Sequence, residues 1–379
     1  MRSAESGLPS VSEATVTVTN VAPSVSLASN SPRPENTAVT VTGLISDPGW
    51  LELLTATIAW GDGSSEPIAG VLENVRPDAT LVFSISHVYG DDGVFVATVC
   101  GNDDDTQTCR AIALTSTNVD PTATIDESGA TVINGVPTIL ANAGSPVTFD
   151  GRSTDPGSDN LTVSWDWDDG PPAPDVTTSH LVNPPALDPL PSPSIQPRNV
   201  LDTQVHAFGQ ACMYDVGLAS GDDDGGAASD TVKVLITGNA LLARSAGYWQ
   251  NAYRDRNHQR FDTATLECYL EIAAFVSLVF DEVRDASTIA AAFDVLRVNN
   301  QVADTEQLDR QLLAALLNFA NGAIGWNELV DADGNGTPDT AFSAAVAAAE
   351  AVRLNPLATK AQIVAQKDVL ERINLSDGG

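Results

Sequence analysis

The pattern of hydrophobic and polar positions changes once along the chain, near residue 240. Before that point, short runs of Val, Thr, Ile and Leu alternate with polar residues and are interrupted by Gly, Pro, Asn and Asp. This period of two is typical of β-strands that bury one face. After it, Ala and Leu predominate and the apolar period lengthens to about 3.6 residues, which predicts helices. We therefore expect a multidomain chain that is all-β and then all-α.

An internal repeat organises the all-β part. Five landmarks occur twice in the same order: TNVAP and TNVDP (19–23, 117–121), SDPG and TDPG (46–49, 154–157), AWGDG and DWDDG (59–63, 166–170), HVY and HAF (87–89, 206–208), VFVATVCGNDDD and MYDVGLASGDDD (94–105, 213–224). The period of roughly 100 to 120 residues is the size of one β-sandwich domain. Two tandem sandwiches are predicted.

These landmarks resemble the polycystic-kidney-disease-type (PKD) repeat, an immunoglobulin-like sandwich with a WDFGDG-like strand end, an HxY and a GxYxVxLxVxD strand. Here they read IAWGDG and WDWDDG, then HVYGDDGVFVATV and HAFGQACMYDVGL. The resemblance covers about residues 21–238, although the second copy has Phe208 for the Tyr and Cys212 for the Gly. It implies an extracellular spacer, ligand-binding module or enzyme appendage rather than a reaction.

The landmark residues have a structural interpretation of their own. Trp60 and Trp167 are expected to fill the space between two sheets. Asp-Gly at 62–63 and 169–170 predicts turns, and His87 and His206 are interpreted as packing residues rather than metal ligands.

The predicted domains follow from these patterns. Residues 1–20 are interpreted as the terminal strand of a truncated preceding repeat, with its strand at 14–19; the alternative is a strand that completes another molecule's sheet. The remaining domains are sandwich 1 (21–118), sandwich 2 (119–239, with a Pro-rich insertion at 171–197 expected to be an irregular surface excursion) and a helical domain (240–379).

Cysteines and aspartate runs supply candidate sites in the sandwiches. Cys100 and Cys109 flank a predicted hairpin loop and are expected to form a disulfide, which implies an oxidising compartment. Cys212 and Cys268 form either a second bridge or two buried thiols. Two hairpin loops carry possible further metal ligands, although solvated turns are the favoured interpretation; these residues are Asp103, Asp104, Asp105, Asp222, Asp223 and Asp224. Asp47 and Asp155 stand in turns and are likewise interpreted as solvated turn residues, with metal binding as the alternative.

The helical domain is expected to be a compact bundle. Its predicted helices are 263–283, 286–298, 305–320, 340–353 and 358–373, with N-caps at Asp262, Asp304 and Asp339. Its loop DADGNGTPD (331–339) places oxygens at the positions of an EF-hand-type calcium loop and resembles EF-hand, dockerin and thrombospondin-type loops. The expected ligands are Asp331, Asp333, Asn335, the Thr337 carbonyl and Asp339. Because Phe342 occupies the twelfth position, a water or a remote carboxylate such as Glu328 or Glu350 must complete the shell.

The segment that joins the sandwiches to the helices is rich in aromatic residues. Residues 245–261 (SAGYWQNAYRDRNHQRF) resemble the GYWKNH-like segment of uncharacterised bacterial secreted proteins, to which no activity is attached. Tyr248, Trp249 and Tyr253 form a candidate ligand groove, with packing against sandwich 2 as the simpler alternative.

The net charge limits the classes of partner that this chain can have. With 50 acidic and 18 basic residues the net charge is −32, which excludes nucleic acid and anionic membranes as partners and makes Ca²⁺ the natural cation; solubility alone is the other explanation. No apolar run is long enough to span a membrane.

We therefore expect a non-catalytic, calcium-stabilised structural or adhesive module, extracellular or on a bacterial cell surface, whose partner is a surface glycan, a protein or another copy of itself. One alternative is an appendage or domain of a secreted polysaccharide or protein hydrolase, with Glu267 and Glu271 as a candidate acid pair. A second alternative is a self-assembling filament subunit. No HExxH or GxSxG motif is present.

Overall fold

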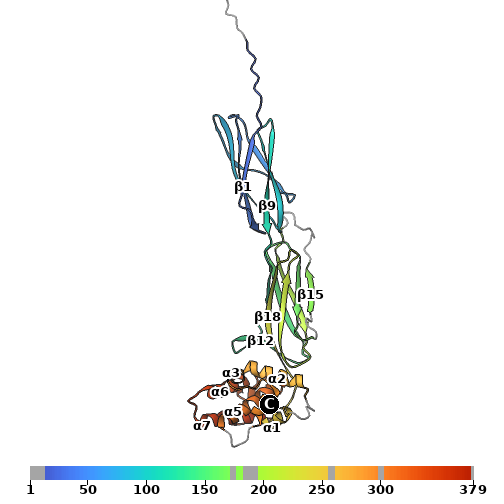
Figure 1. The fold of residues 1–379 in the computed structure, drawn as a ribbon, viewed down its shortest axis with the longest axis vertical. Helices are drawn as coiled ribbons and strands as arrows, with labels where there is room; N and C mark the ends of the chain where they lie inside the picture. The colour runs from blue at the N-terminus through green and yellow to red at the C-terminus, as the bar shows by residue number, and fades with distance from the viewer. Residues whose placement is uncertain (1–12, 171–175, 182–194, 255–260, 298–302, 377–379) are drawn as a thin grey trace, which may run out of the picture. The chain divides into compact units, whose positions relative to one another are not determined.

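The computed structural model describes residues 13–170, 176–181, 195–254, 261–297 and 303–376 (Figure 1). Their contacts define two compact units. Unit 1 comprises described residues 13–119, 155–159 and 195–198, and unit 2 comprises the remaining described residues.

Unit 1 is built from two sheets of strands (Figure 1). Their strand orders are β1-β3-β7-β6 and β2-β9-β8-β4-β5. Its strands are β1 Ser24–Ser29, β2 Arg33–Pro34, β3 Ala38–Asp47, β4 Thr55–Ala59, β5 Ser65–Pro67, β6 Gly70–Val75, β7 Asp78–Val88, β8 Gly93–Asn102 and β9 Gln107–Thr117. Strands β2 and β9 pair in parallel, and the other neighbouring strands in these two sheets are antiparallel. Two sheets with these neighbours form an immunoglobulin-like sandwich.

The alternating sequence explains which side chains fill this sandwich. Along β8, Phe95, Ala97 and Val99 are buried, whereas the neighbouring Val94 and Val96 are exposed. Successive residues of a strand point to opposite faces, so every second residue enters the core. Trp60, 1% exposed, belongs to the same core, as the sequence predicts.

The second sandwich repeats this topology in unit 2. Its sheet orders are β10-β13-β16 and β11-β12-β18-β17-β14-β15, and β12 pairs in parallel with β18 as β2 does with β9. The strands are β10 Thr122–Ile125, β11 Thr131–Ile133, β12 Val136–Asn142, β13 Val147–Asp155, β14 Leu161–Asp166, β15 Val176–Leu181, β16 Arg198–His206, β17 Met213–Gly221 and β18 Ala227–Thr237.

The structure differs from two predictions for the β part. Residues 176–181 of the Pro-rich insertion form strand β15, paired antiparallel with β14, because this stretch has no proline and keeps its N–H donors; residues 171–175 and 182–194 lie outside the described residues. The strand expected at 14–19 is not formed, since a strand requires a paired neighbour and this segment has none in the described chain.

The described residues of unit 2 also form seven helices and a short β-ribbon. They are α1 Ala246–Ala252, α2 Thr263–Val276, α3 Leu278–Glu282, α4 Ile289–Leu296, α5 Asp304–Ala320, β19 Leu329–Val330, β20 Thr340–Ala341, α6 Phe342–Leu354 and α7 Lys360–Leu375. Helix α5 is central: α1, α2, α4, α6 and α7 all contact it. The run QLLAALLNFA is buried throughout, in accord with its mostly apolar sequence.

The helix boundaries correct the sequence predictions at three places. The helix expected over 263–283 is interrupted at Ser277, whose hydroxyl accepts hydrogen bonds from the amides of Val279 and Phe280 and so starts α3. Asp262 caps α2 as expected, but the N-caps of α5 and α6 are Ala303 and Ala341 rather than Asp304 and Asp339. Residue 340 instead pairs with residue 330 in the β-ribbon.

The helices and sandwich 2 share a hydrophobic core, so the boundary predicted at residue 239 does not separate two compact units. Ile133, Ala211 and Leu235 of the sandwich belong to the cluster that contains α5. At the end of β18 the Gly238 amide donates to the Ala320 carbonyl (2.9 Å), and Gly322 has φ +82°. A Cβ on Gly322 would lie 1.8 Å from the Gly238 carbonyl oxygen, so only glycine permits this approach.

Two disulfides lie within the units. Cys100 pairs with Cys109 between β8 and β9, and Cys212 of sandwich 2 pairs with Cys268 of α2. The second bridge decides between the two alternatives that the sequence leaves open.

Replacing both Cys212 and Cys268 by Ala is expected to lower the unfolding free energy of unit 2 by about 4 kcal/mol, because the bridge closes 56 residues. The matched variant Cys100→Ala/Cys109→Ala removes a disulfide that closes a loop of only 9 residues. It should therefore lower the unfolding free energy of unit 1 by only about 2.5 kcal/mol. Guanidinium unfolding followed by tryptophan fluorescence measures both. Equal effects of the two pairs would contradict the loop-closure explanation.

Candidate functional site

The first repeat landmark forms a buried cluster of polar and aromatic groups in unit 1. Trp60 stacks on His87 with 4.7 Å between ring centroids, and His87 Nε2 lies 2.7 Å from Asp62 Oδ2. Asp62 Oδ1 also accepts from the amide and hydroxyl of Ser64, at 2.9 and 2.6 Å. The Tyr89 hydroxyl donates to the Trp60 carbonyl (2.8 Å). The four landmark residues Trp60, Asp62, His87 and Tyr89 therefore all stabilise the turn after β4.

The second landmark builds the same arrangement in unit 2. Trp167 stacks on His206 at 4.5 Å, and His206 Nε2 lies 2.7 Å from Asp169 Oδ2. Phe208, fully buried, replaces Tyr89 and gives up its hydrogen bond. The interpretation of both histidines as packing residues agrees with these contacts.

The aspartate runs bond mainly to their own loops. Asp103 accepts from the amides of Asp105 and Thr106 and from the Asn20 amide group, whose hydrogen bond is the main cause of a pKa lowered to about 2. In the second loop, Asp222 accepts from the amides of Asp224 and Gly226. These contacts are those of well-formed turns.

The 331–339 loop connects β19 to β20 and is organised by Asp331. Its carboxylate accepts from the amides of Gly334 (2.7 Å), Asn335 (3.1 Å) and Gly336 (2.8 Å), and these bonds, that of Gly336 first, lower its pKa. Gly334 and Gly336 have φ +80° and +86°, which glycine adopts without strain.

The other expected ligands of this loop face solvent. Asp333 accepts from the Asn335 amide (3.0 Å), Asn335 Oδ1 accepts from the Thr337 amide (2.7 Å), and Asp339 is exposed. Among the described residues, the carboxylates of Asp331, Asp333 and Asp339 do not gather within 4.8 Å of one another. A bound ion would thus have to draw these oxygens inward.

The carboxylates suggested to complete the loop's ligand shell are placed differently. Glu328 lines the same hollow as Asp331, with Oε2 accepting from the Gly325 amide (2.6 Å). Glu350 is buried on α6, where its Oε1 accepts from the Ser277 hydroxyl (2.5 Å), so it serves the helix core instead. Arg372 donates to the Ala332 carbonyl and already brings a positive charge to the loop.

Two of the three candidate groove aromatics are core residues. Trp249 is fully buried and its indole donates to Asn318 Oδ1 (3.0 Å); Tyr253, 1% exposed, donates to the Leu266 carbonyl (3.0 Å). Neither ring has the free face that stacking on a sugar requires, and only Tyr248 is partly exposed. Trp249 and Tyr253 are therefore core residues that contact helices α5 and α2, whereas the sequence offers a ligand groove or packing against sandwich 2.

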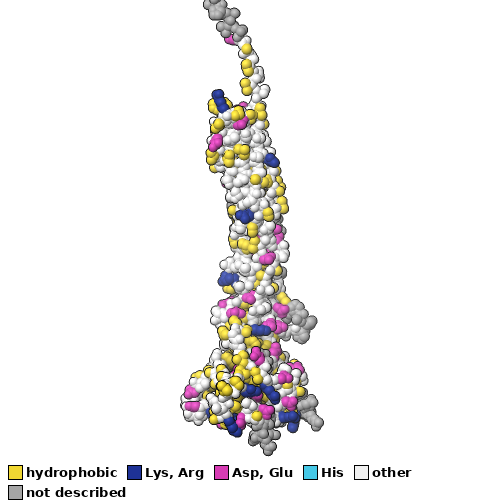
Figure 2. All heavy atoms as spheres, turned by 60° about the vertical axis from the view of Figure 1, so that its left-hand side comes forward, with side chains coloured by type: hydrophobic (Ala, Val, Ile, Leu, Met, Phe, Trp, Pro, Cys, Tyr) yellow, Lys and Arg dark blue, Asp and Glu magenta, His cyan; other side chains and the backbone are white. Residues whose placement is uncertain are grey.

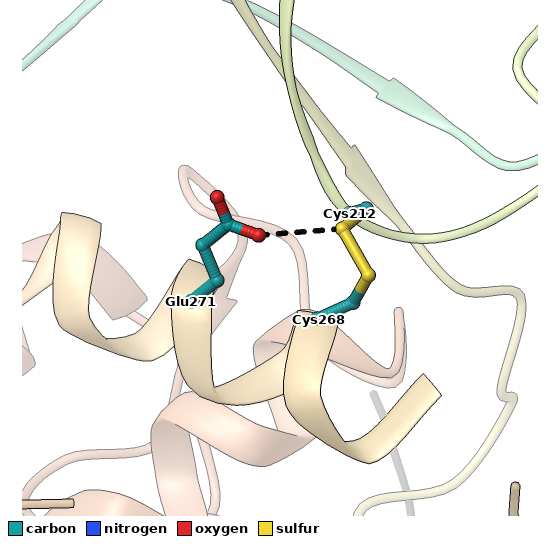
Figure 3. Close-up of side chains that lie close together, drawn as sticks. All are labelled: Cys212, Cys268 and Glu271. Atoms are coloured by element: carbon teal, nitrogen blue, oxygen red, sulfur yellow. Dashed lines mark hydrogen bonds between the residues drawn. A yellow bond between two sulfur atoms is a disulfide. The ribbon is translucent and has the colours of Figure 1, made fainter. Parts of the chain in front are cut away.

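The candidate acid pair on α2 does not form a site. Glu271 is exposed and lies next to the Cys212–Cys268 bridge, with Oε2 3.4 Å from Cys212 Sγ (Figure 3). Glu267 is also exposed and belongs to none of the acidic or metal-ligand groups found among the described residues.

Glu35 and Asp91, each less than 5% exposed, are among the buried acids that the sequence does not single out. Glu35 lies in the sequence PEN and Asp91 in the sequence GDD, both of which are typical of ordinary turns. Their burial depends on residues far along the chain, so no local signal predicts it.

The surface and helices add two observations. Figure 2 shows one face, on which the Lys and Arg side chains of the described residues are scattered, some beside carboxylates and some among uncharged side chains. No helix in the described parts of the chain combines the length and apolar character needed to cross a membrane.

Strand order and landmark clusters define an immunoglobulin-like sandwich protein with appended helices. No protein-family model matches the chain, and no curated protein matches it. Among solved structures it is similar to the PKD domain of an M14-like peptidase from a Thermoplasmatales archaeon (16% identity, 32% of this chain and 98% of that chain, TM-score 0.22). Another is the PKD1 domain of Vibrio anguillarum Epp (15% identity, 26% and 99% covered, TM-score 0.19). A third is the mouse nectin-like molecule 4 ectodomain (12% identity, 58% and 66% covered, TM-score 0.24). At these TM-scores the similarities carry no argument, and the fold rests on the strand pairing.

Asp62→Asn is expected to destabilise unit 1 by about 1 to 3 kcal/mol at neutral pH, because it weakens bonds to Ser64 and His87. Burial alone would raise the pKa of Asp62, but the hydrogen bonds from Ser64 and His87 outweigh it and lower the pKa below 3.8. A lowered folded-state pKa stabilises the protein above about pH 4 and loses this effect as pH falls through the folded value. The difference in melting temperature between wild type and variant should therefore shrink below pH 4. A constant difference down to pH 2 would contradict this assignment.

Proposed function

We propose that this chain is a non-catalytic structural or adhesive module of an extracellular or cell-surface protein, stabilised by calcium in its helical part. The observation that carries the proposal is the use of the landmark residues. In both sandwiches the Trp, His and Asp side chains of the repeat pack and hydrogen-bond with one another. Such side chains are committed to the scaffold and unavailable for catalysis.

Both cysteine pairs support the extracellular part of the proposal. All four cysteines form disulfides, and disulfides form and persist in oxidising compartments. The excess of carboxylates fits the same setting, where millimolar calcium is the abundant hard cation.

The 331–339 loop is the proposed calcium site of the helical part. The loop has carboxylate and amide oxygens at alternate positions and two glycines at positive φ, as a calcium loop needs. Asp331 and Glu328 line one hollow, which brings a further acid close to the first ligand position. Because Arg372 is adjacent and the remaining ligands face solvent, the affinity should be weak, in the range of about 10⁻⁴ to 10⁻³ M.

Calcium at several millimolar is expected to raise the melting temperature of unit 2, and Asp331→Ala/Asp333→Ala should abolish the heat of binding that belongs to this loop. Arg372→Gln should strengthen binding severalfold, since it removes a neighbouring positive charge. Isothermal titration calorimetry and calorimetric melting measure these effects. Asp285→Ala is the matched control, because Asp285 also caps an exposed turn, with Ser287. Equal calcium responses of the wild type and the loop variant would contradict calcium binding at this site.

The non-catalytic part of the proposal has its own test. The intact chain should release no soluble product from chitin, cellulose, casein or collagen. Turnover that is lost on Glu271→Gln or on Glu267→Gln would overturn it in favour of a hydrolase.

A further inference from the structure

A second group of acidic side chains lies inside unit 1, in the part of the fold that receives residues 155–159. These residues belong to the second sequence repeat, yet they pack with residues of the first. The Ser158 amide donates to the Gly90 carbonyl (2.7 Å), and the Gln196 amide donates to the Ser158 hydroxyl (2.8 Å). The backbone thus holds this segment in place.

Four carboxylates are buried here. Glu35, Asp91, Asp155 and Asp159 are 1%, 4%, 1% and 3% exposed. One oxygen each of Glu35, Asp91 and Asp159 lie within 4.8 Å of one another. Calcium binds oxygens at about 2.3–2.6 Å, so ligands of one ion lie at most about 5 Å apart.

Glu35 supplies an independent sign of a ligand. Its Oε1 accepts from the Val119 amide (2.7 Å), which fixes the carboxylate, but its buried Oε2 has no hydrogen-bond partner. A buried carboxylate oxygen without a partner costs free energy unless a cation or proton compensates it. Gly157 keeps the space in front of it open: a Cβ there would lie 2.1 Å from Oε2.

The charges around Glu35 make it an electrostatically strained site. Burial is the main cause that raises its pKa, to about 8, and the neighbouring charges of Asp155, Asp91 and Asp92 raise it further, against the Val119 hydrogen bond. The charged side chains that raise the pKa of this carboxyl, Asp155, Asp91 and Asp92, are all negative. A divalent cation would reverse this repulsion, because its own charge dominates such a site.

We propose that Glu35, Asp91 and Asp159 bind a calcium ion within unit 1. Oxygen-only ligands select a hard cation, and a shell of buried carboxylates favours Ca²⁺ over the more strongly hydrated Mg²⁺. The ion attaches residues 155–159 to the turn that carries Glu35. This site is independent of the loop at 331–339, so either can exist without the other.

The experiment uses the full chain with Asp331→Ala/Asp333→Ala, which removes the loop's contribution. Calcium titrated into this variant should give a single saturable heat of binding and raise the melting temperature of unit 1. Adding Glu35→Gln, which is nearly isosteric, should weaken binding roughly tenfold or more. Calcium should also slow amide hydrogen exchange in residues 155–159, and it should not do so in the Glu35→Gln variant.

Glu73→Gln serves as the matched control, because Glu73 is exposed on β6 and should leave calcium binding unchanged. Asp159→Asn tests the same site from the other segment and decides the question if Glu35→Gln does not fold. Absence of binding in the loop-free variant, or binding that Glu35→Gln and Asp159→Asn leave intact, would overturn the proposal. If the wild type binds calcium and Asp331→Ala/Asp333→Ala does not, this proposal is wrong, whereas the proposed calcium site at 331–339 is supported.

Discussion

The excess of carboxylates is the constraint around which the polar structure of this protein is arranged. With 50 acidic and 18 basic side chains, most carboxylates must find partners other than Lys and Arg. Asp62 is held by Ser64 and His87, Asp103 by backbone amides and Asn20, and Asp331 by three amides of its own loop. Each solution uses local N–H and O–H donors, which stabilise the ionised form. At Glu35 one carboxylate oxygen accepts from the Val119 amide and the other has no hydrogen-bond partner, so that is where the proposed cation has most to contribute.

Unit 1 has a hydrophobic core of its own, whereas the helices share a core with sandwich 2. Unit 1 closes its core between two sheets, with Trp60 at one end of the β4 strand. The helices instead share their core with one side of sandwich 2, and the Gly238–Gly322 approach and the Cys212–Cys268 bridge fasten the two together. A mutation at Gly322 therefore acts on both parts of unit 2, because any Cβ there collides with the Gly238 carbonyl.

The repeated landmarks made the sandwiches predictable because they encode turns and core positions locally. Alternation along 94–100 marks the strand, Asp62-Gly63 marks its neighbour's turn, and the recurrence of both gives the second domain. Helix identities were predictable from the 3.6-residue period, but the break at Ser277 and the ribbon that displaced the Asp339 cap were not. Both depend on distant partners: Ser277 bonds to Glu350, and residue 340 pairs with residue 330.

By itself, the sequence determined the order of β and α parts, the duplication, the pairing of Cys100 with Cys109 and the glycine-rich loop at 331–339, since each is written in residues close together in the chain. Only the tertiary structure decided that Cys212 pairs with Cys268, that Trp249 and Tyr253 are core residues, and that Glu35 meets Asp91 and Asp159. The physical reason is distance along the chain. Burial and charge repulsion depend on which segments fold together, and the turn that carries Glu35 meets a segment more than a hundred residues away.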